Sequence, residues 1–331
     1  MSSEIHVSAP VKASTRTRDV LLLGGLFVLV LIGLGSLAAA TGWEETMAQL
    51  SKLGFVQMLV LLGLSLVNYL FRAFRWHYFT TRLGLGTHLG QNIRHFLGGF
   101  AMSATPGRVG ELIRMRWLKR ETGWSFERTA PLVLVDRASD LAAMSLILGV
   151  ALLFSGAMIR FAIPVTLLAM AGAILVTRPT LLSFSAKSFY KATGLFPRLM
   201  ARIRRAARSL KCFSGASTLT VATLLGLIGW VAEGYAFWLL LVWMQADIGF
   251  AMAVLIFVFS TLAGGLTGAP GGIGGAEAAM VALLVFEGVP LEVALPATAV
   301  IRVTTLWFAI LIGLGVFPYA EAKSLKHKGA H

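Results

Sequence analysis

The chain has 331 residues, of which 57% are hydrophobic and only 13% are charged, and its net charge is +14. Together with a mean hydropathy of +0.79, these values exclude a water-soluble domain, which needs more polar surface at this length, and they predict a polytopic membrane protein. The Lys and Arg residues cluster in loops, where anionic lipid and the positive-inside rule explain them more simply than nucleic acid does. The single cysteine, Cys212, excludes an internal disulfide and a cysteine-based metal cage.

Six apolar segments are long enough to be membrane-spanning helices. The first of them carries no charge and exceeds the about 7 to 15 residues of a signal-peptide core, so we expect it to be retained. The predicted spans are residues 20–40, 53–71, 129–154, 158–176, 216–244 and 293–317.

Two further apolar segments, residues 93–105 and 250–267, run into Pro-Gly elements. A helix broken at membrane depth is tolerated only where its backbone is buried in protein or lines a wet cavity, so we predict re-entrant hairpins near residues 93–120 and 250–287. Proline lacks an N–H and glycine relaxes the backbone, so the turns would present free N–H groups to a central cavity, a geometry that binds anions. The residues expected in the turns are Pro106, Gly107 and Gly110 in the first hairpin and Pro270, Gly271, Gly272 and Gly274 in the second.

Basic segments predict the topology. Residues 178–211 contain nine Lys and Arg and no acid, and the positive-inside rule places a basic loop over residues 178–215 on the cytoplasmic side of a bacterial inner membrane, together with both termini. Within it, residues 197–211 have an apolar and a basic face, which is typical of an interfacial helix on an anionic leaflet, with docking of a partner as the alternative. Further basic residues expected in the cytoplasm are Lys12, Arg16 and Arg18 before the first span and Arg72, Arg75 and Arg82 after the second.

The two Pro-Gly elements indicate an internal duplication. "PGRVGE" begins at Pro106 and "PGGIGGAE" at Pro270, 270 − 106 = 164 residues later. The sequence predicts one all-α membrane domain over residues 1–331, with one half near residues 20–155 and the other near 158–317. Each half would have two spans, a broken hairpin and a third span, and this odd number of crossings would invert the halves; chance similarity is the alternative, because Gly and Pro are common in membrane helices. Four identical pairs lie 165 residues apart, namely Gly123 with Gly288, Glu127 with Glu292, Pro131 with Pro296, and Arg137 with Arg302.

Charged residues within the apolar spans are candidates for substrate binding, because a charge at bilayer depth costs about 2.5 to 3.5 kcal/mol. Arg137 and Arg302 would contact a phosphate, while the acids would balance them or bind a cationic group. Pairing that only locks the helices together is the alternative. The candidate residues are Arg108, Glu111, Arg114, Asp136, Arg137, Asp140, Glu233, Glu277 and Arg302.

Four motifs carry a resemblance to a known family: "LFRAFRW" from Leu70, "SATPGRVGELIR" from Ser103, "LVDRASDL" from Leu134 and "GAPGGIGGAEAAM" from Gly268. On these motifs the sequence resembles the lysylphosphatidylglycerol synthase transmembrane, or flippase-like, family of bacterial and archaeal membrane proteins. The resemblance implies a lipid translocator, which in the best-studied members is fused to a soluble synthase domain. Because the chain ends at His331, soon after the last span, we expect that domain to be absent. Stand-alone members are linked to diverse lipids, including hopanoid and lipid-linked sugar pathways.

Other chemistry has little support in the sequence. The dinucleotide-like "GLGSLA" at residues 33–38 lies inside an apolar span, and His88 and His95 have no third ligand beside them, so we expect no cofactor, no metal and no catalysis. The prediction is a lipid translocator; the alternatives are a membrane-embedded lipid or glycolipid biosynthesis enzyme or its accessory subunit, and a small-solute or ion transporter. Expected partners are membrane lipids, with a lipid-biosynthesis enzyme and a second copy of the chain as further candidates.

Overall fold

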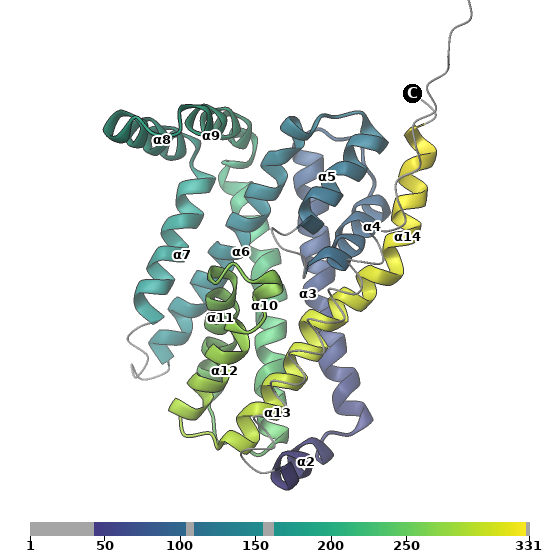
Figure 1. Cartoon of the computed structure of the whole chain (residues 1–331), viewed down its shortest axis with the longest axis vertical. Coiled ribbons are helices and arrows are strands. Elements are labelled where there is room, and N and C mark those ends of the chain that lie inside the picture. The colour runs from purple at the N-terminus through teal and green to yellow at the C-terminus, as the bar shows by residue number, and fades with distance from the viewer. Residues whose placement is uncertain (1–42, 104–108, 155–161, 329–331) are drawn as a thin grey trace, which may run out of the picture.

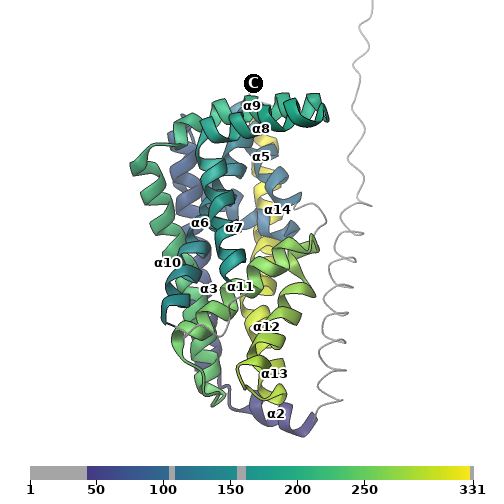
Figure 2. The ribbon, with the colours of Figure 1, turned by 90° about the vertical axis from the view of Figure 1, so that its left-hand side faces the viewer.

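The computed structural model describes residues 43–103, 109–154 and 162–328, and every regular element within these residues is a helix. The longer helices run along one axis, with α8 and α9 lying across one end of the bundle and α2 across the other (Figures 1 and 2). In chain order the helices are α2 (Trp43–Ser51), α3 (Phe55–Arg82), α4 (Leu89–Gly99), α5 (Val109–Thr122), α6 (Phe126–Phe154), α7 (Ala162–Thr177), α8 (Pro179–Thr193), α9 (Pro197–Leu210), α10 (Ala216–Trp243), α11 (Phe250–Leu266), α12 (Gly275–Phe286), α13 (Leu291–Arg302) and α14 (Phe308–Lys328).

Four helical segments of the described chain are long and apolar enough to cross a membrane: α3, α6, α10 and the continuous α13–α14 rod. A fifth crossing would be α7, whose axis turns by 101° into α8. Helices α3, α6, α10 and the α13–α14 rod confirm the spans predicted over residues 53–71, 129–154, 216–244 and 293–317. The span predicted over residues 158–176 corresponds to α7, which reaches the length of a span only together with α8. The span predicted over residues 20–40 lies outside the described residues. The α13–α14 rod contains a π-helical turn, Val303–Trp307, and such turns often occur at functional sites.

Two helix pairs, α4–α5 and α11–α12, are too short to cross and turn back within the bundle. Gln91 near the start of α4 donates a hydrogen bond of 2.5 Å to Glu121 near the end of α5. Asp247 before α11 and Gly288 after α12 line the same small pocket. Each pair therefore begins and ends at one end of the bundle, as expected for a re-entrant hairpin.

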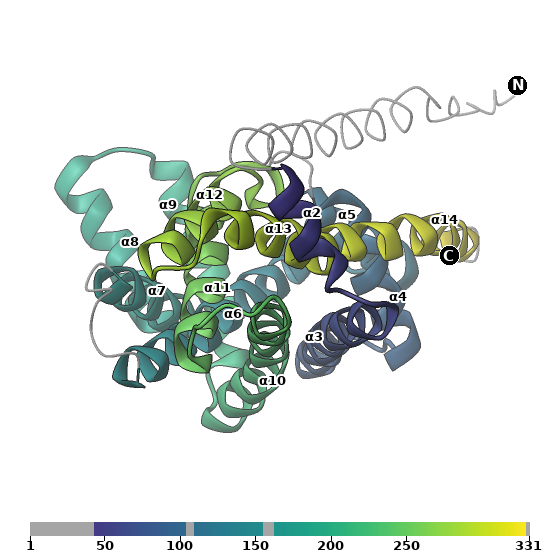
Figure 3. The same cartoon turned by 90° about the horizontal axis from the view of Figure 1, so that it is seen from below.

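The two hairpins enter from opposite ends of the molecule (Figure 1). The open end of α4–α5 lies beside the end of α14, where Arg120 contacts Glu321 at 2.7 Å. The open end of α11–α12 lies beside α2, where Lys52 donates a hydrogen bond of 2.9 Å to Gln245. Seen along the bundle, α7 and the end of α14 lie at opposite edges (Figure 3). Gly99 at the end of α4 and Leu266 at the end of α11 line the same cavity in the interior.

Close packing of α3 on α10 depends on two glycines. A Cβ atom at Gly229 would lie 3.3 Å from the Cα atom of Asn68, and one at Gly226 would lie 3.0 Å from the Nη1 atom of Arg75. Helices approach closely in membranes where small residues line the contact. These glycines leave room between α3 and α10 for the Arg75 side chain.

The expectation that Arg72 and Arg75 lie in a cytoplasmic loop is wrong. Helix α3 continues to Arg82, and the Arg75 side chain is fully buried within it. The physical reason is pairing: aspartates on α6 contact both guanidinium groups, which offsets the cost of burying the charges.

The predicted basic loop over residues 178–215 contains two helices, α8 and α9. The helix predicted over residues 197–211 is present as α9, whose Ala207 and Leu210 are buried against the bundle, and its place at a membrane interface stays a prediction. Helix α8 leaves Phe184 and Phe189 exposed, at 68% and 45%. An exposed aromatic face beside basic side chains is typical of a helix that lies at a membrane surface.

Candidate functional site

A cavity of about 610 Å³ is lined by residues of both hairpins. Gly99, Ser103 and Gly110 line it from the first hairpin, and Leu266 and Gly272 from the second. Side chains of α3, α6, α7, α10 and the π-helical turn complete the walls. The cavity therefore collects residues from both halves of the sequence.

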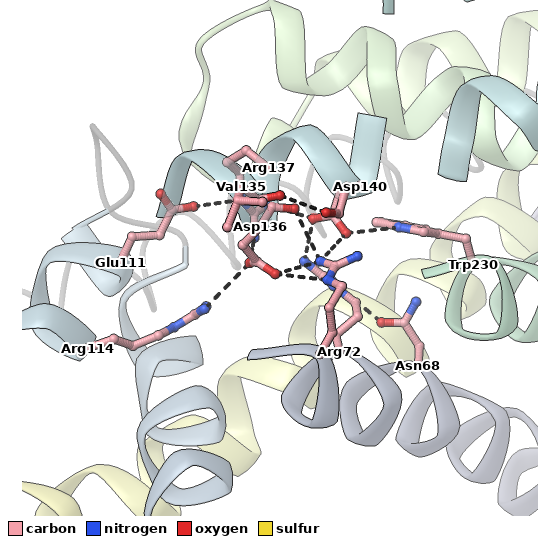
Figure 4. A network of polar contacts seen from close by, with 11 residues as sticks. Asn68, Arg72, Glu111, Arg114, Val135, Asp136, Arg137, Asp140 and Trp230 are labelled. Carbon is pink, nitrogen blue, oxygen red and sulfur yellow. Dashed lines mark hydrogen bonds and ion pairs between the residues drawn. The ribbon is translucent and has the colours of Figure 1, made fainter. Parts of the chain in front are cut away.

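One wall carries a buried network of ion pairs built on α6 (Figure 4). Asp136 and Asp140 are four residues apart and so share one face of the helix. The Nη2 atom of Arg75 lies 2.6 Å from Asp136 and 2.7 Å from Asp140. Arg72 lies 2.9 Å from Asp140, and the indole of Trp230 donates a hydrogen bond of 3.2 Å to the same carboxylate. The two aspartates therefore join α3, α6 and α10.

Arg137 is the arginine of this network that is most open to the cavity. Its side chain is 29% exposed and lies 2.9 Å from Asp136, 3.2 Å from Asp140 and 3.2 Å from Glu111 at the tip of the first hairpin. Arg114 approaches Asp136 only at 3.9 Å. Three carboxylates thus hold the Arg137 guanidinium in place, which preorganises it for a further anion.

Arg114 is supported mainly by aromatic rings. Its guanidinium lies 4.2 Å from the centroid of Phe96 and 5.3 Å from that of Trp76. Cation–π contacts of this kind stabilise an arginine away from water. The side chain is 5% exposed and lines the cavity beside Glu111.

The second hairpin is tied to the last spanning rod by Arg302. The Nε atom of Arg302 lies 2.6 Å from Glu277, and its Nη2 atom donates a hydrogen bond of 3.1 Å to the carbonyl oxygen of Gly271. The other oxygen of Glu277 accepts a hydrogen bond of 2.7 Å from the N–H of Gly274. The expectation of a free N–H at Gly274 is therefore wrong, because this N–H already donates its hydrogen bond to Glu277.

The turn of the second hairpin requires its glycines. Gly271, Gly272 and Gly274 have φ angles of 63°, 69° and 84°, a region that is unstrained only for glycine. Gly110 of the first hairpin differs from our expectation, because it is helical within α5. A Cβ atom there would collide with the carbonyl oxygen of Gly99. Gly110 therefore allows α5 to approach α4 closely and does not form the turn.

Most of the predicted site residues meet in this cavity. Asp136 and Glu277 do not line the cavity but pair with Arg137 and Arg302, which do. Pro106, Gly107 and Arg108 lie outside the described residues. Pro270 begins the turn that precedes α12. The predicted residues that line the cavity are Glu111, Arg114, Arg137, Asp140, Glu233 and Arg302, together with Gly110, Gly271 and Gly272.

Sequence reasoning missed Arg72, Arg75, Tyr69 and Trp230. Arg72, Tyr69 and Trp230 line the cavity, and Arg75 supports it from behind. The available signal was the motif "LFRAFRW", in which apolar residues continue on both sides of two arginines three residues apart. That spacing puts both arginines on one face of a continuing helix.

Another part of the cavity wall is apolar. Val165, Leu168 and Ala169 of α7 line it, and Leu266 at the tip of α11 faces the same cavity. Leu168 is 65% exposed and Leu266 is 70% exposed. These exposed leucines form an apolar mouth of the cavity.

No group of three or more His, Cys, Asp or Glu side chains that could hold a metal occurs in the described ranges. His95 instead lies 3.2 Å from Glu121, where it joins α4 to α5. His88 is exposed at the start of α4.

The sequence matches known proteins along nearly all of its length. The family model described as the lysylphosphatidylglycerol synthase TM region matches residues 21–313. A UPF0104 membrane protein of Methanothermobacter thermautotrophicus is 28% identical over 120 residues, which are 36% of this chain and 36% of that protein. Another UPF0104 membrane protein, from Methanocaldococcus jannaschii, is 26% identical over 236 residues, which are 69% of this chain and 97% of that protein. The chain therefore belongs to the lysylphosphatidylglycerol synthase TM-region family of multi-pass membrane proteins.

Proposed function

We propose that this protein moves a lipid between the two leaflets of its membrane. An anionic phosphate or sugar-phosphate headgroup enters the cavity, and the acyl chains stay in the surrounding hydrocarbon. The observation that carries the proposal is the cavity itself. It is lined by residues of two hairpins that enter from opposite ends, with arginines on one part of its wall and an apolar mouth on another. An amphiphile has the same division into a charged and an apolar part.

The arginines supply the contacts for a phosphate. Arg137 is open to the cavity, and Arg302 uses only Nε and Nη2 for its hydrogen bonds to the described residues. Guanidinium groups bind phosphate through charge-assisted and often bidentate hydrogen bonds. Because carboxylates already fix both groups, a headgroup can bind them without first ordering two long side chains.

Matched ion pairs support alternating access to the cavity. Glu111 and Glu277 are each the third residue of the second hairpin helix (111 − 109 + 1 = 3 and 277 − 275 + 1 = 3). Each contacts the twelfth residue of the next helix, Arg137 or Arg302 (137 − 126 + 1 = 12 and 302 − 291 + 1 = 12). Inverted repeats with broken helices meeting at the midplane are a common transporter design, and we propose that design here.

We also propose an orientation and a location. The end of the bundle that carries α8 and α9 would face the cytoplasm of a bacterial inner membrane, because its basic residues suit an anionic leaflet. The end that carries α2 would face outward. Partners would be membrane lipids, and we propose that the protein itself makes and breaks no covalent bond.

The test is lipid transfer in vesicles that contain the purified protein and a fluorescent phosphatidylglycerol. An impermeant quencher reports the fraction of label in the outer leaflet over time. Arg137→Ala is expected to abolish transfer, and Arg82→Ala, the same change at the exposed end of α3, is expected to leave it intact.

Mass spectrometry of the lipids after the reaction separates the alternatives. A new lipid species would support an enzyme, whereas unchanged lipids with protein-dependent movement support a translocator. Saturable uptake of a soluble headgroup without any lipid movement would instead support a solute transporter. Equal transfer by the wild-type protein and Arg137→Ala would reject the cavity as the route.

A further inference from the structure

Glu233 is a buried carboxylate without a partner in the cavity. It lies on α10, is 5% exposed and lines the cavity wall. In the described part of the chain it forms no hydrogen bond and no ion pair within 4 Å. The cavity carboxylates Glu111 and Asp140 each contact an arginine, as do Asp136 and Glu277 behind them. Among the cavity carboxylates of the described chain, Glu233 is therefore the one without a direct ion pair.

The hydrogen bonds formed by the side chains around Glu233 go to other acceptors. Arg72 and Trp230 donate to Asp140, and the hydroxyl of Tyr69 donates to the carbonyl oxygen of Thr305. Arg302 donates to Glu277 and to the turn of the second hairpin. A buried charge without hydrogen bonds is strongly disfavoured. The Glu233 carboxylate can therefore accept a proton, or a hydrogen bond from a group that enters the cavity.

Charged groups from three other helices surround Glu233. Arg72 of α3, Asp140 of α6 and Arg302 of α13 are those that interact with it electrostatically, and Tyr69 of α3 also faces it. Arg72 and Glu233 occupy the same position in two helices of equal length, each being the eighteenth of 28 residues (72 − 55 + 1 = 18 and 233 − 216 + 1 = 18). Because Arg72 and Arg302 both interact electrostatically with Glu233, a headgroup that binds either arginine will lie close to Glu233.

We propose that Glu233 is a proton-binding site that couples headgroup binding to the proton gradient. The proposal rests on the proposed lipid transfer and adds its source of energy. A phosphate beside Glu233 places two negative charges in a poorly hydrated space, where their repulsion is strong. A proton on the Glu233 carboxylate removes that repulsion. By linkage, the protonated carboxylate favours the anion and the bound anion favours protonation.

The coupling fixes the charge that crosses the membrane. A Glu233 oxygen takes a proton from water on the acidic side, the headgroup binds, and the same proton returns to water on the other side. A headgroup of charge −1 and a proton of charge +1 move together, so the step is electroneutral. A pH difference drives it and a membrane potential does not. A carrier without the proton would move net negative charge and respond to the potential.

Vesicle transfer under an imposed gradient tests this coupling. With protein and fluorescent phosphatidylglycerol in the membrane, an acidic exterior is expected to enrich the label in the inner leaflet, by about tenfold per pH unit for one proton per lipid. A potassium-diffusion potential of either sign is expected to have no effect. In Glu233→Gln the pH difference is expected to have no effect on the leaflet ratio, whatever the absolute rate.

A proton count tests the same site without transport. Calorimetric titration of the detergent-purified protein with dihexanoyl phosphatidylglycerol, in two buffers of different ionisation enthalpy and at a pH high enough to ionise Glu233 in the empty cavity, is expected to show uptake of about one proton per bound lipid. Glu233→Gln is expected to show about none. Glu292→Gln, which changes a carboxylate in the small pocket near α2, is expected to behave as the wild-type protein.

The outcomes separate the two proposals. Wild-type transfer that follows the potential and ignores the pH difference, or binding without proton uptake, would overturn the proton site and leave lipid transfer standing. Absence of any wild-type transfer would overturn lipid transfer itself. If Glu233→Gln does not accumulate in the membrane, Glu233→Asp keeps a titratable group, and loss of the pH response in that folded variant would also count against the proposal.

Discussion

The guanidinium of Arg302 lies 2.6 Å from the carboxylate of Glu277, on the helix that follows the second hairpin turn. The same arginine donates a hydrogen bond to Gly271 within the turn, and Glu277 accepts one from Gly274. One ion pair therefore fastens the tip of the hairpin to the α13–α14 rod. We expect the tip and the rod to move as one body when the cavity changes its access.

Removing one partner of this pair is expected to destabilise the protein. In Arg302→Ala, Glu277 remains as an unpaired buried charge, which lowers the free energy of unfolding by about 3 to 5 kcal/mol. The double variant Arg302→Ala with Glu277→Ala removes both charges and is expected to recover most of this loss without recovering lipid transfer. Thermal unfolding in detergent, followed by tryptophan fluorescence, measures the first effect. Normal transfer by the double variant would show that Arg302 serves only to hold the turn.

Two arginines that contact Asp136 are expected to differ in role. Arg75 is fully buried and lies behind the cavity, whereas Arg137 is 29% exposed and lines it. Arg75→Met is therefore expected to lower the melting temperature and the yield of folded protein. Arg137→Ala is expected to reduce stability less, because its pairs are partly hydrated, and to abolish transfer. A folded, active Arg75→Met variant would contradict this division.

The glycine turn gives a prediction with a matched control. Gly271 has a φ angle of 63°, and a Cβ atom there would lie 3.3 Å from Leu306, so Gly271→Ala is expected to cost about 1 to 3 kcal/mol of stability and to slow transfer. Gly63 is helical within α3, and a Cβ atom at that position would meet no neighbouring side chain within 4 Å. Gly63→Ala is expected to be neutral or to stabilise by up to about 1 kcal/mol. Equal effects of the two changes on melting temperature would show that the turn does not need its glycine.

Cysteine labelling tests the orientation. In a variant whose Cys212 is replaced by Ser, a single cysteine at Asp247 is expected to react with an impermeant maleimide added outside intact cells. A cysteine at Ser188, on α8 at the other end of the bundle, is expected to react only after permeabilisation. The reverse pattern would invert the orientation and leave the fold unchanged. Reaction of both from one side would contradict hairpins that enter from opposite ends.

The spans and hairpins were predictable because their signals are local. An apolar run shorter than the bilayer that ends in Pro and Gly cannot cross, and both α4–α5 and α11–α12 turn back as expected. The conformation of Gly271 follows from the same local reading, since a turn at that depth needs a residue that tolerates positive φ.

The ion-pair network was only partly predictable. The charged residues of α6 could be identified within a span, but Arg75 and Asp136 are 61 residues apart in sequence, and no local pattern shows that they meet. The predicted span over residues 53–71 stops before Arg72, whereas α3 continues to Arg82. The sequence does not show this continuation, because the aspartates that pair with the arginines lie on another helix. The pairing of Glu277 with Arg302 likewise depends on how the hairpin folds back on the rod.

The apolar mouth beside Leu168 and Leu266 sets which part of a lipid limits its passage. Drawing a chain of fifteen methylene groups through water would cost about 12 kcal/mol at about 0.8 kcal/mol per methylene, which slows crossing by roughly a factor of 10⁹. In the proposed lipid transfer, acyl chains that pass beside these two exposed leucines would stay in hydrocarbon and would not meet that barrier. Acyl length and saturation would then have little influence on the rate, and the cargo would be selected by its headgroup.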